Sequence, residues 1–128
     1  MANTENDFWG NGWQEAAFIG TTTTLTNAAM GITQEVTASV TTTLPAAAVG
    51  SLFAFRVGAP GLTVKIKPAS TETMTGMGFT PTASNILTLA NAPAGSTVIL
   101  LAGSTSNWNI VFCNLGGAAR SVLAYAAT

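Results

Sequence analysis

The chain has 128 residues, enough for one domain with a single core. Only 7% of them are charged, against about 25% in an average globular domain, and the formal net charge is -1. Four basic residues cannot form the positive patch that binds nucleic acid, and the absence of histidine excludes histidine-based catalytic triads and metal sites. Because a surface with so little charge favours association, we expect neighbouring molecules to cover much of it.

The sequence carries no signal for disulfides, membranes or export. Its one cysteine, Cys113, excludes an intrachain disulfide and follows the apolar residues NIVF, which predicts a small buried side chain. No apolar run approaches the roughly 20 residues of a membrane span. The N-terminus MANTENDFWG has neither the basic start nor the apolar centre of a secretory signal. We therefore expect synthesis in the cytoplasm and no membrane partner.

Residues 1–16, MANTENDFWGNGWQEA, differ in composition from the rest of the chain. They contain two of the three tryptophans and three of the five acidic residues. The pair Asn11-Gly12 is a turn signal that would bring Trp9 and Trp13 close together. Two interpretations stay open: a segment folded back onto its own domain, or an arm that anchors on a neighbouring subunit through large aromatic contacts.

From residue 17 to residue 128 the pattern is typical of one all-β domain. The stretch TQEVTASVTTTL alternates with period two, which predicts a single strand. One face of that strand would be formed by Val36, Ala38, Val40, Thr42 and Leu44. Pro45 ends the strand because it has no N–H donor for a sheet ladder.

Two alternating runs, SLFAFRV and LTVKIK, follow on either side of GAPG. The first run places Phe53, Phe55 and Val57 on one side. The second sends Leu62, Val64 and Ile66 inward and leaves its lysines outward. Because GAPG is a turn sequence, the two runs predict a β-hairpin.

Four further strands are predicted in the C-terminal part of the chain. ILTLA is a short strand, and STVILLA is apolar on both faces, which predicts a fully buried central strand. WNIVF places Trp108, Ile110 and Phe112 on one face, and RSVLAYAAT forms a last strand. In total we expect about eight short antiparallel strands in a β-sandwich or jelly-roll-like barrel, preceded by the extended N-terminal arm.

Two segments of the chain resemble each other. When LPAAAVGSLFAFRV is set beside LANAPAGSTVILLA, Gly50-Ser51 matches Gly95-Ser96, an offset of 45 (95 minus 50). The same offset sets LTVKIK over NWNIVF. We expect both segments to form the same unit of corner and hairpin, and the two units to pack against each other as opposed sheets.

The residue types that carry catalysis are scarce. Glu35 and Glu72 are isolated from each other and are expected to be exposed, and Cys113 has no histidine to activate it. Neither a phosphate-binding loop nor an acidic calcium loop is present. We therefore expect no enzymatic activity, no cofactor and no metal site, and a function carried by surfaces.

Three stretches of the sequence follow a recurring pattern: TLPAAAVGSLFAFRV, GLTVKIKPASTETMTGMG and LTLANAPAGSTVILLAGSTSNWNIV. In these stretches the chain resembles structural proteins of tailed bacteriophages. That pattern has a TLPAA…G corner, a G-x-T-V-x-I-x-P-A strand, a Thr-apolar-x-Gly turn and a V-x-L-x-A…W-x-V hairpin. The acidic residue that usually precedes the turn is here Glu72, within TETMTG.

The pattern occurs in small capsid decoration (cement) proteins and in distal modules of fibres and spikes, commonly as β-rich homotrimers. The resemblance implies a decoration protein on the outer surface of an assembled phage head. Its partners would be the major capsid protein and further copies of itself, a homotrimer paired through small, Thr-rich strand faces. The arm would reach the capsid through aromatic residues: Phe8, Trp9, Trp13 and Phe18.

Two other functions stay open. A distal fibre or spike knob would bind host glycans by stacking sugar rings on Trp108 or Tyr125, although Trp108 shares a face with Ile110 and Phe112 and is expected in the core. We expect 128 residues to leave no room for a fibre shaft, which favours decoration. A non-viral adhesin or lectin is disfavoured because the chain has neither a secretory signal nor a pair of cysteines.

Overall fold

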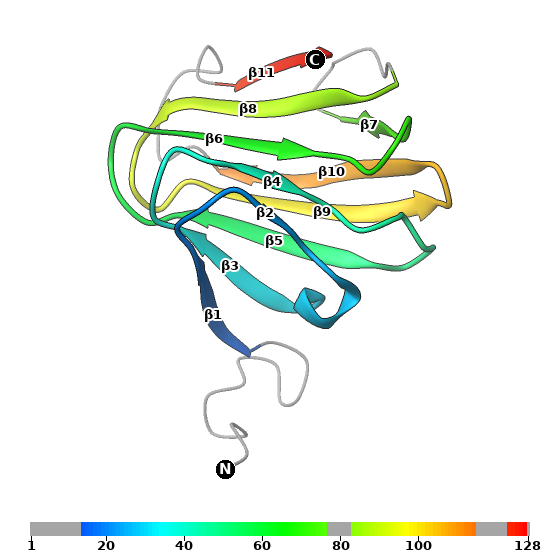
Figure 1. The fold of residues 1–128 in the computed structure, drawn as a ribbon, viewed down its shortest axis with the longest axis horizontal. Coiled ribbons are helices and arrows are strands. Elements are labelled where there is room, and N and C mark those ends of the chain that lie inside the picture. The colour runs from blue at the N-terminus through cyan, green and yellow to red at the C-terminus, as the bar shows by residue number, and fades with distance from the viewer. Residues whose placement is uncertain (1–13, 77–82, 115–122, 128) are drawn as a thin grey trace.

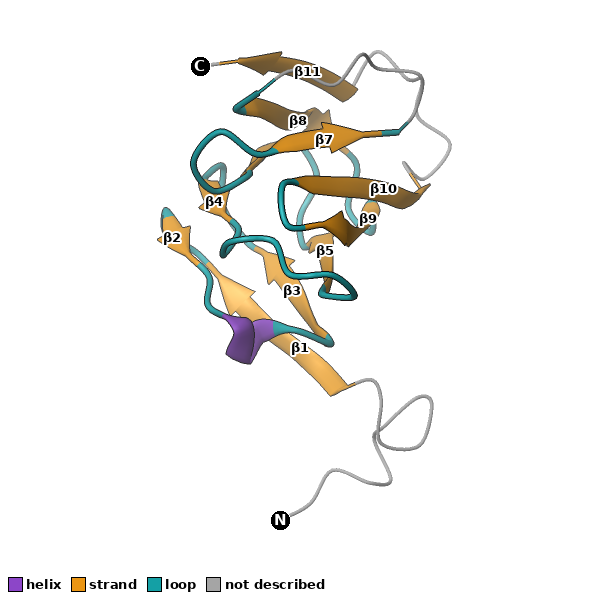
Figure 2. Cartoon of the chain, turned by 90° about the vertical axis from the view of Figure 1, so that its right-hand side faces the viewer, coloured by secondary structure: helices purple, strands orange, loops and turns teal. Residues whose placement is uncertain are grey.

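The computed structural model describes residues 14–76, 83–114 and 123–127. They form an all-β sandwich, as predicted, with helix limited to one short 3-10 turn, η2 (Asn27–Ala29). Figure 1 shows the strands running alongside one another in two overlapping layers, and Figure 2 shows those layers from the side. No helix in these ranges is long and apolar enough to cross a membrane.

The two layers are a six-stranded sheet, which we call sheet A, and a five-stranded sheet, which we call sheet B. In spatial order, sheet A contains β1 (Gln14–Ile19), β3 (Ile32–Val36), β5 (Leu52–Val57), β9 (Thr97–Ser104), β10 (Asn107–Asn114) and β7 (Thr73–Thr75). Sheet B contains β11 (Leu123–Ala127), β8 (Asn85–Ala92), β6 (Leu62–Lys67), β4 (Thr41–Thr43) and β2 (Thr23–Thr24).

The first six strands alternate between the sheets, with odd-numbered strands in sheet A and even-numbered strands in sheet B. Because each crossing reverses the chain, alternate strands run in the same direction and pair in parallel, as in β1–β3–β5 and β2–β4–β6. The later pairs in β5–β9–β10 and β6–β8–β11 are antiparallel, and the edge strand β7 pairs in parallel with β10. The sandwich therefore mixes both pairings instead of being antiparallel throughout.

Two local predictions are wrong because of these crossings. The single strand expected over residues 33–44 is split into β3 and β4, which belong to different sheets. The hairpin expected around GAPG does not form, because β5 lies in sheet A and β6 in sheet B. In both cases the chain passes from one layer to the other where a turn within one layer was expected.

The predicted repeat is confirmed for the corner and for the strand that follows it, β5 in the first segment and β9 in the second. Ala48–Ser51 and Pro93–Ser96 are both four-residue turns closed by a backbone hydrogen bond, 2.9 Å and 3.2 Å long. Their third residues, Gly50 and Gly95, both have a φ of 88°, a left-handed conformation that favours glycine. Buried positions also coincide in the two segments, for example Leu44 with Leu89.

The strands that follow the two corners, β5 and β9, lie side by side in sheet A and are related by a local two-fold axis. Gly50 N–H donates to Ala102 O (3.0 Å), and Gly95 N–H donates to Val57 O (2.7 Å). Gly50 and Gly95 are 45 residues apart, and so are Val57 and Ala102, so the two bonds join equivalent positions of the two repeats. Strands β5 and β9 are therefore antiparallel neighbours. The prediction that the two units form opposed sheets is wrong, and so is the match of LTVKIK with NWNIVF, since β6 and β10 lie in different sheets.

The core lies between the sheets and is centred on Trp108 and Phe53, both fully buried. Their rings meet edge to face, with centroids 5.6 Å apart. Trp108 and Ile110 point inward from β10 as predicted, but a bulge between Ile110 and Phe112 turns Phe112 outward. Cys113 follows the bulge and is half-buried against the core.

Candidate interaction surfaces

The Glu72 carboxylate is buried and connects distant parts of the chain. Its Oε1 accepts a hydrogen bond from Trp108 Nε1 (3.1 Å), and its Oε2 accepts one from the Ala47 backbone N–H (3.0 Å). The prediction of an exposed Glu72 is therefore wrong. Three parts of the phage-like pattern meet at this carboxylate: the TLPAA corner, the TETMTG turn and the tryptophan hairpin. Glu72 acts as a structural connection between them.

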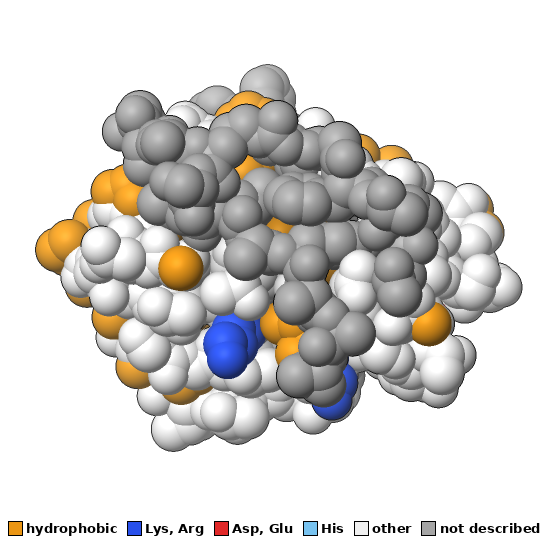
Figure 3. All heavy atoms as spheres, turned by 90° about the horizontal axis from the view of Figure 1, so that it is seen from above, with side chains coloured by type: hydrophobic (Ala, Val, Ile, Leu, Met, Phe, Trp, Pro, Cys, Tyr) orange, Lys and Arg blue, Asp and Glu red, His pale blue; other side chains and the backbone are white. Residues whose placement is uncertain are grey.

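The other charged side chains that the structure describes lie on the two outer faces of the sandwich. Glu35 and Arg56, on neighbouring strands of sheet A, form an ion pair. Lys65 and Lys67 belong to β6 of sheet B. Within the ranges that the structure describes, no three Asp, Glu, Cys or His side chains are placed so that they could hold a metal ion. Figure 3 shows one charge-poor side of the molecule, on which blue side chains are few and no red ones are visible.

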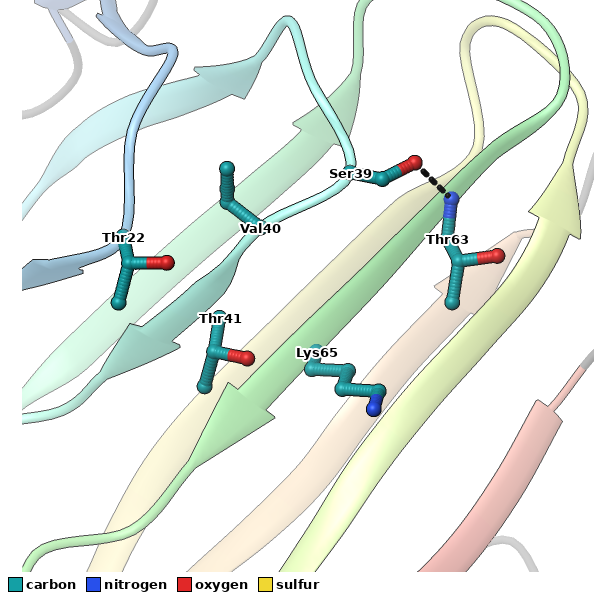
Figure 4. Close-up of a pocket in the computed structure, with 6 residues that line it drawn as sticks. All are labelled: Thr22, Ser39, Val40, Thr41, Thr63 and Lys65. Carbon is teal, nitrogen blue, oxygen red and sulfur yellow. Dashed lines mark hydrogen bonds between the residues drawn. The ribbon is translucent and has the colours of Figure 1, made fainter.

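A shallow depression of about 260 Å³ opens on sheet B. It is lined by Thr22, Ser39, Val40, Thr41, Thr63 and Lys65 (Figure 4). Ser39 Oγ accepts a hydrogen bond from the Thr63 backbone N–H (2.9 Å), which ties the loop before β4 to β6. This lining offers hydroxyl groups and one ammonium group but no carboxylate, so it lacks the acid–base pair of a hydrolytic site.

The outer face of sheet A has an apolar centre. Along β9, buried and half-buried residues alternate, so that Ile99 and Leu101 lie on the side away from the core. Leu52 pairs with Leu101, and Phe112 pairs with Ile99. We use the term apolar face for this set: Leu52, Ile99, Leu101, Val111 and Phe112.

The outer face of sheet B is polar by contrast. The outward positions of β4 and β6 are occupied mainly by threonine and lysine, as in Thr41, Thr43, Lys65 and Lys67. Among the described side chains, all large exposed hydrophobic residues belong to strands of sheet A or to the segments that lead into them: Phe18, Met30, Val49, Val111 and Phe112. The two faces are therefore suited to different surroundings.

The structure describes only some of the predicted contact residues. Phe18 lies on the edge strand β1 and is 72% exposed, as a contact residue requires. Phe8, Trp9 and Trp13 lie outside the described residues. Residues 14–16 of the predicted arm belong to β1. The surface patch around Phe112 escaped prediction because the alternation of WNIVF placed Phe112 inward.

Of the two residues suggested for glycan stacking, the structure describes the side chain of Trp108 but not that of Tyr125. Trp108 is fully buried, and its ring packs against Phe53, so neither ring face is accessible to a sugar. The backbone of Tyr125 pairs with Leu87 in sheet B, and its side chain lies outside the described residues. Comparison with protein-family models found no match to this chain, and comparison with curated proteins found none either.

Proposed function

We propose that this protein is a non-enzymatic structural protein of a tailed-phage virion that decorates the outer surface of the assembled head. The observation that carries the proposal is the combination of a charge-poor sandwich with large exposed hydrophobic residues gathered on one sheet. Exposed apolar patches of this kind mark interaction sites. The meeting of the phage-like corner, turn and hairpin at Glu72 supports the proposal, because the shared sequence pattern then corresponds to one structural unit.

A decoration protein stabilises a head because it binds the assembled lattice and not the separate capsid subunits. Each bound copy lowers the free energy of the assembled state by mass action, and many copies multiply a modest contact energy. Phe18 fits a role at such a contact, because an exposed aromatic side chain on a rigid edge strand loses little entropy when it is covered. The major capsid protein is the partner that we propose for Phe18 and for the aromatic residues before it.

The test is binding to undecorated heads of the phage that encodes the protein. The truncation should remove residues 1–13 only, because β1 begins at Gln14 and a longer deletion would remove part of sheet A. We expect this truncation and Phe18→Ser each to lower occupancy at least tenfold in a co-sedimentation assay. Val49→Ser is the matched control, since Val49 is also 72% exposed but lies in the turn before β5.

The result decides between roles. Wild-type protein that fails to bind heads would overturn decoration. Binding by wild type and by all three variants alike would overturn the assignment of the contact to the N-terminal region. A knob that binds glycans would appear at the tail ends in electron micrographs of the particle, whereas decoration would appear over the whole head.

A further inference from the structure

Strand β9 is covered on one side only, although its sequence is apolar on both. Its inward residues Val98 and Leu100 are buried in the core. Its outward residues Ile99 and Leu101 are only half-buried, in the middle of sheet A between β5 and β10. A central strand with this composition is typical of sheets whose two faces are both packed. Among the residues that the structure describes, no further strand or helix of the same copy packs on this second face.

The apolar side chains of neighbouring strands extend this exposed region. Phe112 and Val111 on β10 are 47% and 52% exposed, and Phe112 lies beside Ile99. Leu52 lies beside Leu101 on the opposite strand β5. Ala54, which pairs with Ile99, is already buried beneath these larger neighbours. The apolar face is therefore continuous across three adjacent strands.

The described charges next to this face neutralise each other. Glu35 and Arg56 lie next to the apolar face on β3 and β5 and form an ion pair with each other. A strongly charged partner would therefore find no complementary net charge here. A second copy of the same chain brings an identical uncharged face, and a net charge of -1 per chain gives little repulsion between copies.

We infer that the apolar face is the surface through which copies of this protein associate. With strands about 4.8 Å apart and a rise of about 3.4 Å per residue, the apolar face on β5, β9 and β10 covers on the order of 300 Å² in projection. A standard specific interface buries about 800 Å² of accessible surface per partner, so a contact through this face is small and the oligomer that it forms is weak and reversible. The contact would be apolar, in contrast to the Thr-rich pairing expected from the sequence.

Sedimentation velocity of the purified chain tests this inference without any capsid. Over about 1 to 100 µM, we expect wild-type protein to shift from monomer to oligomer. Phe112→Glu and Val111→Glu should each weaken association at least tenfold, because burying an unpaired carboxylate is costly. Both side chains point away from the core, so both variants should keep the wild-type thermal transition measured at low concentration.

Thr88→Glu is the matched control. Thr88 is half-buried on the outer face of sheet B, and it pairs with Lys65, which makes a glutamate favourable there. It adds the same charge as the test variants, and we expect association within about twofold of wild type. An oligomer of two or three copies that Phe112→Glu dissociates and Thr88→Glu does not would support the inference.

Two results would overturn it. One is wild-type protein that stays monomeric throughout the concentration range, and the other is an oligomer that both face variants leave unchanged. Neither result bears on decoration, because capsid binding is measured separately with undecorated heads. Equally, failure to bind heads would leave the association measurement unaffected.

Discussion

Residues 41–57 and 86–102 share a Gly-Ser corner of the same conformation and then continue in different ways. Each segment runs along sheet B, passes through a Gly-Ser corner and enters sheet A beside the other. After that point the first chain segment returns to sheet B as β6, whereas the second turns back within sheet A as β10. Similar strands therefore do not determine the later path of the chain; the connecting loops do.

The two loops differ in their hydrogen-bond partners. After β5, Gly58 N–H donates to Val36 O in sheet A, and Gly61 N–H donates to Ala92 O in sheet B, so the GAPG loop spans both layers. After β9, Ser104 pairs with Asn107, and Ser106 N–H donates to Ser104 Oγ (3.2 Å) in a short turn. A loop that is bonded at each end to a different sheet excludes the hairpin that the sequence alone predicts.

The largest expected effect concerns the support of the first corner. Ala47 N–H, in the first repeat, donates to the Glu72 carboxylate, whereas the described contacts of the second corner are with hydroxyl and backbone groups, such as Ser96 Oγ–H donating to Pro93 O (2.7 Å). Glu72→Ala leaves two donors without an acceptor, Ala47 N–H and Trp108 Nε1–H, and should lower the free energy of unfolding by about 2–5 kcal/mol. Urea denaturation at one fixed protein concentration measures the loss.

Glu35→Ala is the control for the loss of a carboxylate, since Glu35 forms its ion pair with a half-exposed arginine at the protein surface. We expect it to cost less than about 1 kcal/mol. If Glu72→Ala costs no more than Glu35→Ala, Glu72 does not hold the first corner, and the contrast between the corners is lost.

The next effect tests how alike the two corners are. Gly50 and Gly95 share a φ of 88°, and both have open space where a Cβ atom would lie. Alanine at either position therefore meets only the backbone penalty of the left-handed conformation, about 1–2 kcal/mol. We expect Gly50→Ala and Gly95→Ala to lower the free energy of unfolding by amounts that agree within about 0.5 kcal/mol. A difference above about 1 kcal/mol would contradict the equivalence of the corners.

The smallest expected effect is an increase in the free energy of unfolding. Thr42 is fully buried, and its hydroxyl is the one buried side-chain polar atom without a hydrogen bond in the part of the chain that the structure describes. The equivalent residue of the second repeat is the buried Leu87. Thr42→Val should raise the free energy of unfolding by about 1 kcal/mol, because it removes an unsatisfied group without changing shape.

Thr43→Val is the neighbouring control. Thr43 is half-buried on the outer face of sheet B and matches Thr88 of the second repeat, so its replacement should change stability by less than about 0.5 kcal/mol. If Thr42→Val lowers the free energy of unfolding, the Thr42 hydroxyl has a hydrogen-bond partner. The first repeat then differs from the second, which has the apolar Leu87 at this position.

The sequence predicts the layers of this fold better than their connections. Period two and turn residues are sufficient to predict the sandwich and the inward direction of Trp108. The unbroken apolar run of β9 correctly predicts its central place in a sheet, but not its full burial, because Ile99 and Leu101 are half-buried. The crossing at residues 37–40 was missed because Val36 and Leu44 both face the core, so the alternation of apolar residues looks the same for a straight strand and for a crossing. Alternation carries no information about which sheet a strand joins.

Two features of the surface escaped prediction for physical reasons. The bulge after Ile110 turns Phe112 outward, and a bulge leaves no mark on a short apolar run. Glu72 is buried because its two donors come from Ala47 and Trp108, which are distant in sequence. A lone carboxylate near a turn is usually exposed, and only the folded chain supplies the donors that make its burial favourable.

The repeated crossing of the chain in β1–β6 has a consequence for folding kinetics. Each parallel neighbour in a sheet is separated along the chain by a strand of the other sheet, so few of these pairings are local in sequence. Loop closure must then precede most of the stabilising contacts, which places such topologies among proteins that fold in milliseconds to seconds. The β9–β10 hairpin closes the shortest loop among the strand pairs described, and we expect the folding nucleus to form there.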